Sequence, residues 1–402
     1  MKNLDLPTSR NYLDEFIKRT ILPARQKRSN TIFFLPGTGR TSLMRYITDR
    51  REVLEKELNI KFGNLTWLLV DTQNEEILIS DWLRTIRKQK RKIPKARTSS
   101  LDQILEFLVD ELRQRVLLCP LMSEEGISVT RLESLRRIKS PIIDFQFSFA
   151  REIKVEKMKN HLGNLAQFGL QSIWFMPFYT TEGIEAIIQN QIRQGFTKAK
   201  LKQKEKIIGL SGGYPRLVRF FLRNPEKLNT ASWQEIEVKH FFNEIWDCLS
   251  EDSQQWLFKL ISSKKAKLPL PGNYLVETRL IQRKNDHWRF FSPLFKNYIE
   301  FLAKSMPPQV TEKEGIISVS GKNIDLILSS QETKIFKLLW QKRNHIVSRD
   351  EIALILWGNN WYEKYSNWAI DQLMARIRRK LGDRTEQNLI KTIRGKGFTI
   401  NS

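Results

Sequence analysis

Short apolar runs alternate with helical patterns over the first half of the chain. Five runs bounded by turn residues are typical of buried strands, and they cover residues 30–35, 66–71, 116–119, 141–149 and 172–176. Between them, residues 43–54 and 101–113 have helical spacing. Short strands that alternate with helices predict a parallel α/β sheet.

The pattern changes in the middle of the chain. Residues 241–246 and 253–261 have helical spacing, and the apolar runs 273–281 and 287–295 flank a polar turn at 283–286. Two apolar runs around a polar turn predict a β-hairpin. Helices followed by a hairpin favour a winged-helix fold for this region.

Three more helical patterns occupy the C-terminal region, at residues 330–340, 348–357 and 368–381, followed by a hairpin pattern at 389–400. Ser330 and Ser348 stand where N-caps are expected, and Glu351 completes a capping-box spacing. Gly358 and Gly382 end the second and third patterns. The third pattern has apolar residues at intervals of three and four, which predict a core stripe: Ile370, Leu373, Met374, Ile377 and Leu381.

Cationic residues gather on the third pattern and on the hairpin. Arg376, Arg379 and Lys380 fall off the apolar stripe, and Arg378 lies near its edge. Gly395 and Gly397 allow a tight turn whose tip carries the cations Arg394 and Lys396. Guanidinium groups can donate to guanine edges or to phosphates, so this pattern favours DNA binding over a solvated helix face.

The region resembles the winged helix-turn-helix of OmpR/PhoB-type bacterial regulators. The resemblance implies that the third helix enters the major groove of double-stranded DNA. It also implies that Arg376 and Arg378 contact bases or backbone and that Arg394 is the wing arginine. The chain has Leu373 where the family often has a polar or basic residue. RNA polymerase and self-association are further expected partners.

The glycine-rich segment after the first strand run has the position of a phosphate loop. Its candidate nucleotide-binding residues are Gly37, Thr38, Gly39, Arg40, Thr41 and Ser42. Phe34 stands at the first glycine of the pattern, and Arg40 replaces the lysine that reaches the β- and γ-phosphates. Arginine is planar and larger than lysine, so the replacement is not conservative.

The third strand run ends without the acidic residue that would hold Mg²⁺. It reads Val116-Leu-Leu-Cys-Pro120, and Glu124 and Glu125 come too late for that role. Gly212-Gly-Tyr-Pro215 resembles the Gly-x-Pro element of STAND/AAA-like P-loop ATPases. The resemblance implies a degenerate ATPase domain that contributes no catalytic residues. It leaves ATP or ADP binding open, with Pro215 as one contact.

Composition restricts the remaining function classes. The chain carries 68 Lys and Arg residues against 44 Asp and Glu residues, a formal net charge of +24, which suits a polyanionic partner. Cys119 and Cys248 lie in apolar runs, as in reduced intracellular proteins. The histidines have no metal-site spacing. No apolar run approaches the roughly 18 residues of a membrane span, and the start does not read as a signal peptide, so we expect no membrane partner and a cytoplasmic location.

Two basic tracts lie outside the C-terminal region, at residues 84–97 and 197–206. For the first tract, solvated surface and extra phosphate contact stay equally open, and for the second, solvated surface is favoured.

The expected fold is a multidomain α/β plus α+β chain, with a P-loop NTPase-like parallel sheet followed by two winged-helix domains. The predicted division is an ATPase-like domain at 1–232, a middle winged helix at 233–305, a linker at 306–314 and the DNA-binding domain at 315–402.

We predict a sequence-specific transcriptional regulator whose hydrolysis-deficient P-loop domain serves as sensor, scaffold or assembly module. Two alternatives stay open. One is an active DNA-associated NTPase of a mobile-element or defence system, and the other is a winged-helix adaptor that binds proteins.

Overall fold

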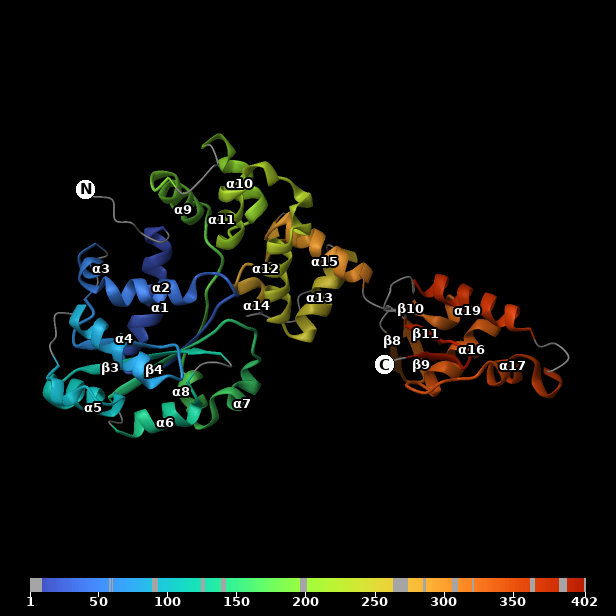
Figure 1. Cartoon of the computed structure of the whole chain (residues 1–402), viewed down its shortest axis with the longest axis horizontal. Coiled ribbons are helices and arrows are strands. Elements are labelled where there is room, and N and C mark those ends of the chain that lie inside the picture. Colours follow the sequence, from blue (N-terminus) through green and yellow to red (C-terminus); the bar gives the residue numbers. More distant parts are fainter. Residues whose placement is uncertain are drawn as a thin grey trace. The chain divides into compact units, whose positions relative to one another are not determined.

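The computed structural model describes the chain apart from residues 1–8, 58, 60, 89–92, 124–126, 139–141, 196–200, 263–273, 285–286, 306–309, 320–321, 362–365, 383–388 and 401–402. The chain divides into two compact units, Met1–Tyr298 and Ile299–Ser402 (Figure 1). Each unit is described by itself.

A five-stranded parallel sheet forms the core of the first unit. Its strands are β1 Asn30–Phe33, β2 Leu65–Val70, β3 Arg115–Met122, β4 Ile143–Phe149 and β5 Ile173–Phe175. They lie in the order β2-β3-β4-β1-β5, and every neighbouring pair is parallel. The predicted parallel α/β sheet is therefore confirmed.

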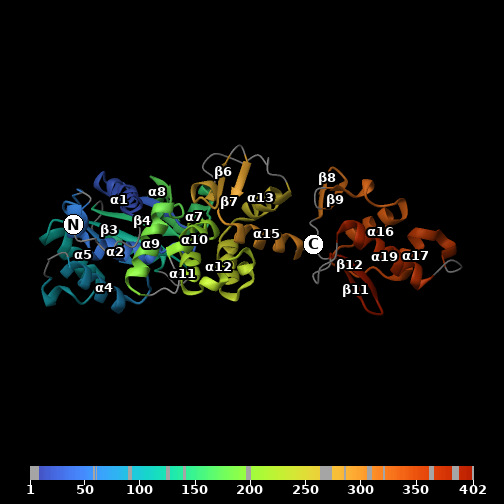
Figure 2. The same ribbon diagram turned by 90° about the horizontal axis from the view of Figure 1, so that it is seen from above.

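Helices lie on both faces of this sheet, which explains why β4 is buried along its whole length. Figure 2 shows α1 (Arg10–Arg25) and α8 (Ala166–Gly169) on one side of the strands, with α2 (Arg40–Asp49) and α4 (Glu75–Lys88) on the other. The other helices are α3 Arg51–Glu57, α5 Leu101–Glu106, α6 Val129–Ile138, α7 Met158–Leu162, α9 Thr181–Arg193, α10 Lys204–Ser211 and α11 Pro215–Arg223.

Three details of the helices differ from the sequence prediction. The helix predicted at 43–54 is two helices, because the backbone leaves helical geometry at Arg50. The helix predicted at 101–113 continues beyond α5 as the π-helix η2, Phe107–Glu111. No pattern predicted α1, although it buries Leu13, Phe16 and Ile17 against the core.

The middle region contains α12 Ile236–Asp247, α13 Glu251–Ser262, α14 Tyr274–Glu277, β6 Ile281–Lys284, β7 His287–Phe290 and α15 Pro293–Ser305. β6 and β7 pair as an antiparallel hairpin, as predicted. The hairpin is shorter than predicted because Tyr274 starts a helical turn instead of a strand. The hydroxyl of Tyr274 donates to the Phe34 carbonyl at 2.6 Å, which ties this turn to the exit of β1.

The second unit contains the three predicted helices and the predicted terminal hairpin. Its elements are β8 Val310–Lys313, β9 Ile316–Val319, β10 Lys322–Asn323, η8 Ile324–Leu326, α16 Ser330–Gln341, α17 Arg349–Trp357, α19 Asn367–Leu381, β11 Ile390–Ile393 and β12 Gly397–Ile400. β8 pairs with β9 in an antiparallel sheet. Residues 310–313 of the predicted linker, 306–314, are therefore part of the folded unit.

Capping boxes start two of these helices. Ser348 accepts from the Glu351 amide and donates its own amide to the Glu351 carboxylate at 2.7 Å, as predicted. At α16 the cap is Ser329, which exchanges the same two bonds with Glu332, and the prediction of Ser330 was wrong by one residue. Both serines are polar neighbours, and only Ser329 has the extended backbone that an N-cap needs.

The terminal hairpin is bonded to the segment just before α17, and Gly397 lies at this contact. Phe398 exchanges backbone hydrogen bonds of 2.8 and 2.9 Å with Val347. A Cβ atom at residue 397 would overlap the Val347 carbonyl oxygen, and its φ of +146° is one that side chains rarely adopt. Glycine is therefore required by this close approach as well as by the turn.

Candidate nucleic-acid interface and phosphate loop

The position of α19 is set by a cap, a buried stripe and a glycine. Ser366 accepts from the Ala369 amide at 3.4 Å, and Gly382 ends the helix in the left-handed conformation. All five residues of the predicted stripe are buried, including Leu373. The opposite face of α19 therefore points to solvent.

That exposed face carries both predicted and unpredicted residues. Arg376 and Arg379 are exposed, and neither has an ion-pair partner among the residues that the structure describes. The helical repeat places Trp368 and Gln372 on the same face; Trp368 is 72% exposed and Gln372 is exposed as well. Sequence reasoning missed these two because it searched for cations, although the buried stripe alone defines their face.

Arg378 and Lys380 make contacts within the unit. The guanidinium of Arg378 donates to the Ile390 carbonyl at 2.8 and 3.0 Å and to the Thr392 hydroxyl at 2.8 Å, which fastens α19 to β11. The ammonium of Lys380 pairs with the Glu332 carboxylate at 2.6 Å, which fastens α19 to α16.

The carboxyl of Glu332 belongs to both the α16 cap and this ion pair. Burial acts to raise its pKa, but the hydrogen bonds from Lys380 and Ser329 outweigh burial and lower the pKa from its usual 4.5. The carboxylate therefore stays ionised at neutral pH and holds the two helices together.

The tip of the terminal hairpin carries two exposed cations. The Lys396 amide donates to the Ile393 carbonyl at 3.0 Å, and Gly395 supplies a φ of +73° for the turn. Arg394 and Lys396 are exposed on either side of Gly395. The hairpin thus adds a second cationic element to that of α19, within the same unit.

In the first unit, the candidate phosphate loop connects the end of β1 to the start of α2. Gly37 and Gly39 have φ values of +74° and +84°. The Thr38 hydroxyl donates to the Leu35 carbonyl at 2.8 Å, and the Tyr179 hydroxyl donates to the Thr38 carbonyl at 3.3 Å. Strand, glycine-containing loop and helix thus follow one another as in P-loop proteins. The hydroxyls of Thr38 and Tyr179 fix the loop by bonding its backbone carbonyls.

Arg40 points into the sheet. Its guanidinium donates to the Ser148 carbonyl of β4 at 2.9 Å. Burial lowers the pKa of Arg40 to about 10, and the nearby Tyr274 opposes this shift. Arg40 therefore serves as an internal hydrogen-bond donor. Thr41, at the start of α2, is half-buried and Ser42 is exposed.

The Gly-Gly-Tyr-Pro element packs directly on the loop. A Cβ atom at residue 37 would overlap the Tyr214 hydroxyl, and it would lie 2.5 Å from Nε of Arg216. Pro215 is buried as the first residue of α11. The guanidinium of Arg216 pairs with the Glu244 carboxylate and stacks 5.3 Å from the Phe241 ring. The structure thus places Tyr214 and Arg216, on either side of Pro215, in the space beside Gly37.

Among the described residues, β3 ends without a carboxylate partner for Mg²⁺. β3 runs through Cys119 and Pro120 to Met122, and Glu124 and Glu125 lie outside the described residues. Asp71, after β2, is paired with Arg45 at 2.6 Å. Across the described ranges, no group of three or more His, Cys, Asp or Glu side chains could hold a metal ion.

The basic tract at 84–97 is partly neutralised. Arg84 pairs with Asp81, Lys88 with Asp49, and Arg97 with Glu111. Residues 89–92 of this tract and 197–200 of the second tract lie outside the described residues.

Cys119 and Cys248 are buried free thiols, and burial raises the pKa of both. None of the helices in the described part of the chain has the length and apolar character that crossing a bilayer needs.

Comparison with known proteins supports the assignment of the second unit. The family model "Transcriptional regulatory protein, C terminal" matches residues 321–400. The transcriptional regulatory protein HprR of Escherichia coli strain K12 is 35% identical over 83 residues, which are 21% of this chain and 36% of HprR. The response regulator GraR of Staphylococcus aureus strain Mu50 is 27% identical over 110 residues, 26% of this chain and 48% of GraR. The chain thus spans a third to a half of these relatives' length, and residues 321–400 form the predicted OmpR/PhoB-type domain.

Solved structures also match part of the chain at low identity. The Walker-type ATPase of Pyrococcus abyssi covers 73% of this chain and 96% of its own length, with 14% identity and a TM-score of 0.43. The predicted parallel sheet is present, and the predicted order of strand, glycine-containing loop and helix follows its first strand.

Proposed function

We propose that this protein is a sequence-specific, double-stranded DNA-binding transcriptional regulator. The observation that carries the proposal is that one unit exposes Arg376 and Arg379 on α19, without an acidic partner among the described residues, and also a cationic hairpin tip. The segment that contains them matches a transcriptional-regulator domain. Cations that are exposed and without an acidic partner can neutralise DNA phosphates without first breaking internal bonds.

The residues of α19 take different roles in this proposal. Arg376 and Arg379 approach base edges or phosphates in the major groove, where an arginine can bond guanine with two donors. Gln372 is placed to read adenine, and Trp368 to contact apolar base edges. Arg394 and Lys396 contact the neighbouring minor groove or backbone.

Arg378 and Lys380 act in this proposal by positioning. Arg378 sets the hairpin against α19, and Lys380 sets α19 against α16. If Arg378 or Lys380 also bound DNA, its side chain would have to keep or give up these internal bonds.

For the first unit we propose a hydrolysis-deficient module that senses, scaffolds or assembles. Arg40 is committed to Ser148, and β3 carries no carboxylate at its described end. Without a lysine and an anchored Mg²⁺, the charge that develops on a transferred phosphoryl group is poorly stabilised. In this proposal ATP or ADP binding uses the loop backbone and Thr41, with Tyr214 and Arg216 beside Gly37.

The test is DNA affinity of the full chain, measured on a selected site and on unrelated duplexes at several salt concentrations. Arg376→Ala should cost about 1–3 kcal/mol on the selected site if it contacts bases. Arg193→Ala is the matched control, because it also removes one exposed arginine but lies on α9.

Three outcomes of this measurement are informative. Specific loss in Arg376→Ala alone supports base reading. Equal loss on every sequence restricts Arg376 to phosphate contact. No binding of the wild-type chain at low salt removes the proposal and favours the protein-binding adaptor.

A further inference from the structure

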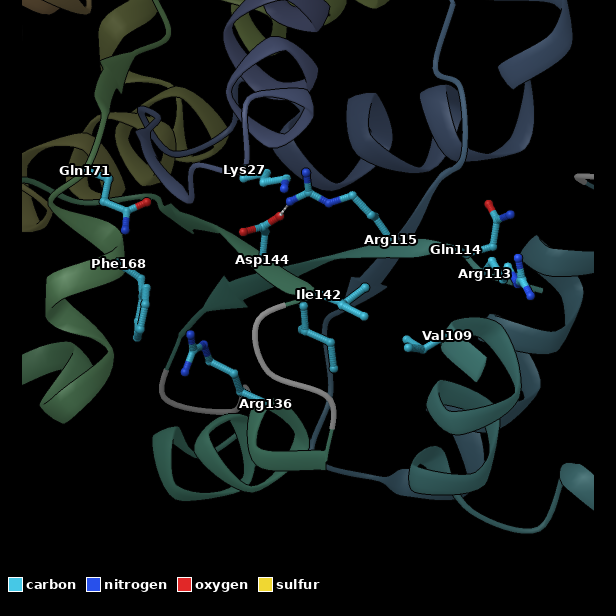
Figure 3. Close-up of a pocket in the computed structure, with 11 residues that line it drawn as sticks. Lys27, Val109, Arg113, Gln114, Arg115, Arg136, Ile142, Asp144, Phe168 and Gln171 are labelled. Carbon is cyan, nitrogen blue, oxygen red and sulfur yellow. Dashed lines mark hydrogen bonds and ion pairs between the residues drawn. The ribbon is translucent and has the colours of Figure 1, made fainter. Parts of the chain in front are cut away.

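A cavity opens at the N-terminal ends of the strands in the first unit's sheet. Its volume is about 530 Å³. Figure 3 shows lining residues from the connections into β1, β3 and β4, from α6 and from the segment before β5. The phosphate loop follows the C-terminal end of β1, so the cavity and the loop lie at opposite ends of the parallel strands.

The cavity is cationic. Lys27, Arg113, Arg115 and Arg136 line it together with a single carboxylate, that of Asp144. Arg115 forms an ion pair with Asp144, and this pair is nearly buried. The lining residues therefore leave an excess of three positive charges around one cavity.

Arg136 lines the cavity, and its guanidinium is held against an aromatic ring. Its Nε atom is buried and has no hydrogen-bond partner within the described structure. Its guanidinium lies 3.9 Å from the centre of the Phe168 ring, and Figure 3 shows both side chains at one end of the cavity. The stacked ring holds this guanidinium in a fixed position beside the cavity.

Two of the cations stand at strained backbone positions. Lys27 has φ +60° and Arg113 has φ +49°, and both follow helices, α1 and η2. Glycine or asparagine usually fills the left-handed position after a helix. Strained residues cluster at ligand sites because the surrounding structure keeps them for function.

We propose that this cavity binds a small organic phosphate with an apolar or aromatic portion. Guanidinium groups pair with phosphate through two parallel donors, and the cavity is lined by Arg113, Arg115 and Arg136. Phe168 and the neighbouring Ile142 give the apolar wall for the rest of the ligand. The volume lies in the range of small-molecule sites. This site is separate from the phosphate loop and does not depend on DNA binding.

The probe is 1-naphthyl phosphate, with binding to the full chain measured by titration calorimetry. 1-Naphthol and inorganic phosphate, which each keep one half of the probe, should bind at least about tenfold more weakly. Arg136→Gln should weaken probe binding by about tenfold or more. Arg137→Gln is the matched control, because Arg137 is the next residue of α6, is exposed and does not line the cavity.

A second variant guards against misfolding. Lys27→Asn removes a cavity charge, and asparagine suits φ +60° better than lysine does. It should therefore hold or raise the melting temperature of the free protein while weakening probe binding.

The outcomes separate the cavity from other cationic surfaces. Equal weakening in Arg136→Gln and Arg137→Gln would overturn the proposal in favour of non-specific attraction to a basic protein. Weakening in Thr41→Ala, with Arg136→Gln unchanged, would move the probe to the phosphate loop and also overturn it.

Discussion

On α19, the guanidinium groups of Arg376 and Arg379 are exposed, whereas beside the phosphate loop the guanidinium of Arg40 is turned into the sheet. Both regions were predicted to hold anionic ligands through arginine. In the second unit, other residues make the internal bonds, and these arginines are left for a partner. In the first unit, Arg40 itself bonds Ser148, and Tyr214 and Arg216 pack on Gly37. The difference shows that an arginine's neighbours, more than its type, decide whether its guanidinium is exposed or bonded inside the protein.

The largest loss of stability is expected from disrupting the terminal hairpin, which carries Arg394 and Lys396 at its tip. Gly397→Ala would force a Cβ atom into the Val347 carbonyl at a disfavoured φ, and strain and overlap together should cost roughly 3 kcal/mol. Gly395→Ala, with φ +73° and open space around its Cβ position, should cost only about 1 kcal/mol. Thermal unfolding of both variants checks this, and equal losses would contradict the required close approach.

The next effect concerns the buried arginine. Arg40→Ala removes a charged donor to Ser148 and should destabilise the first unit by about 1–3 kcal/mol. Phosphate release from ATP should stay at background in the wild type and in the variant, with or without DNA. Turnover that disappears in Arg40→Ala would overturn the internal role and favour the active NTPase. Turnover that survives the substitution would point to a contaminating enzyme.

A smaller effect is expected where the second unit uses its own charges internally. Because the folded-state pKa of Glu332 lies below 4.5, its carboxylate stabilises the fold above that pH. This contribution is lost as the pH falls through the folded-state pKa. Glu332→Gln should therefore cost about 1–2 kcal/mol at pH 7 and progressively less below pH 4.5.

Hydrogen exchange of peptides covering α16 measures this effect within the second unit, at pH 7 and at low pH. A cost that does not change with pH would show that packing, not the ionised carboxylate, accounts for the effect of Glu332→Gln.

Local patterns predicted much of the fold. Apolar periodicity located the five strands, the three C-terminal helices and the buried stripe of α19, because burial follows the repeat of each element. The errors lie where tertiary contacts decide. The sequence prediction placed the N-cap of α16 at Ser330, the equally polar neighbour of the observed cap Ser329. Tyr274 forms a helical turn, and its hydroxyl bonds the Phe34 carbonyl after β1.

The roles of single charged residues were the least predictable. Lys380 reaches Glu332, which is 48 residues earlier in the chain, and Arg40 reaches Ser148, which is 108 residues later. The cationic cavity gathers side chains from several separate connections. No local pattern contains such pairings, since they arise only when distant segments are packed together.

The central claim is that α19 reads DNA sequence through Arg376 and Arg379. The most direct measurement is a genome-wide footprint of the full chain in its own cells, compared with a chain carrying Arg376→Ala and Arg379→Ala. The predicted result is a recurrent sequence motif at the wild-type sites and loss of those sites in the double variant, with the protein still folded. Wild-type sites without a common motif, or the same sites in both chains, would contradict the claim.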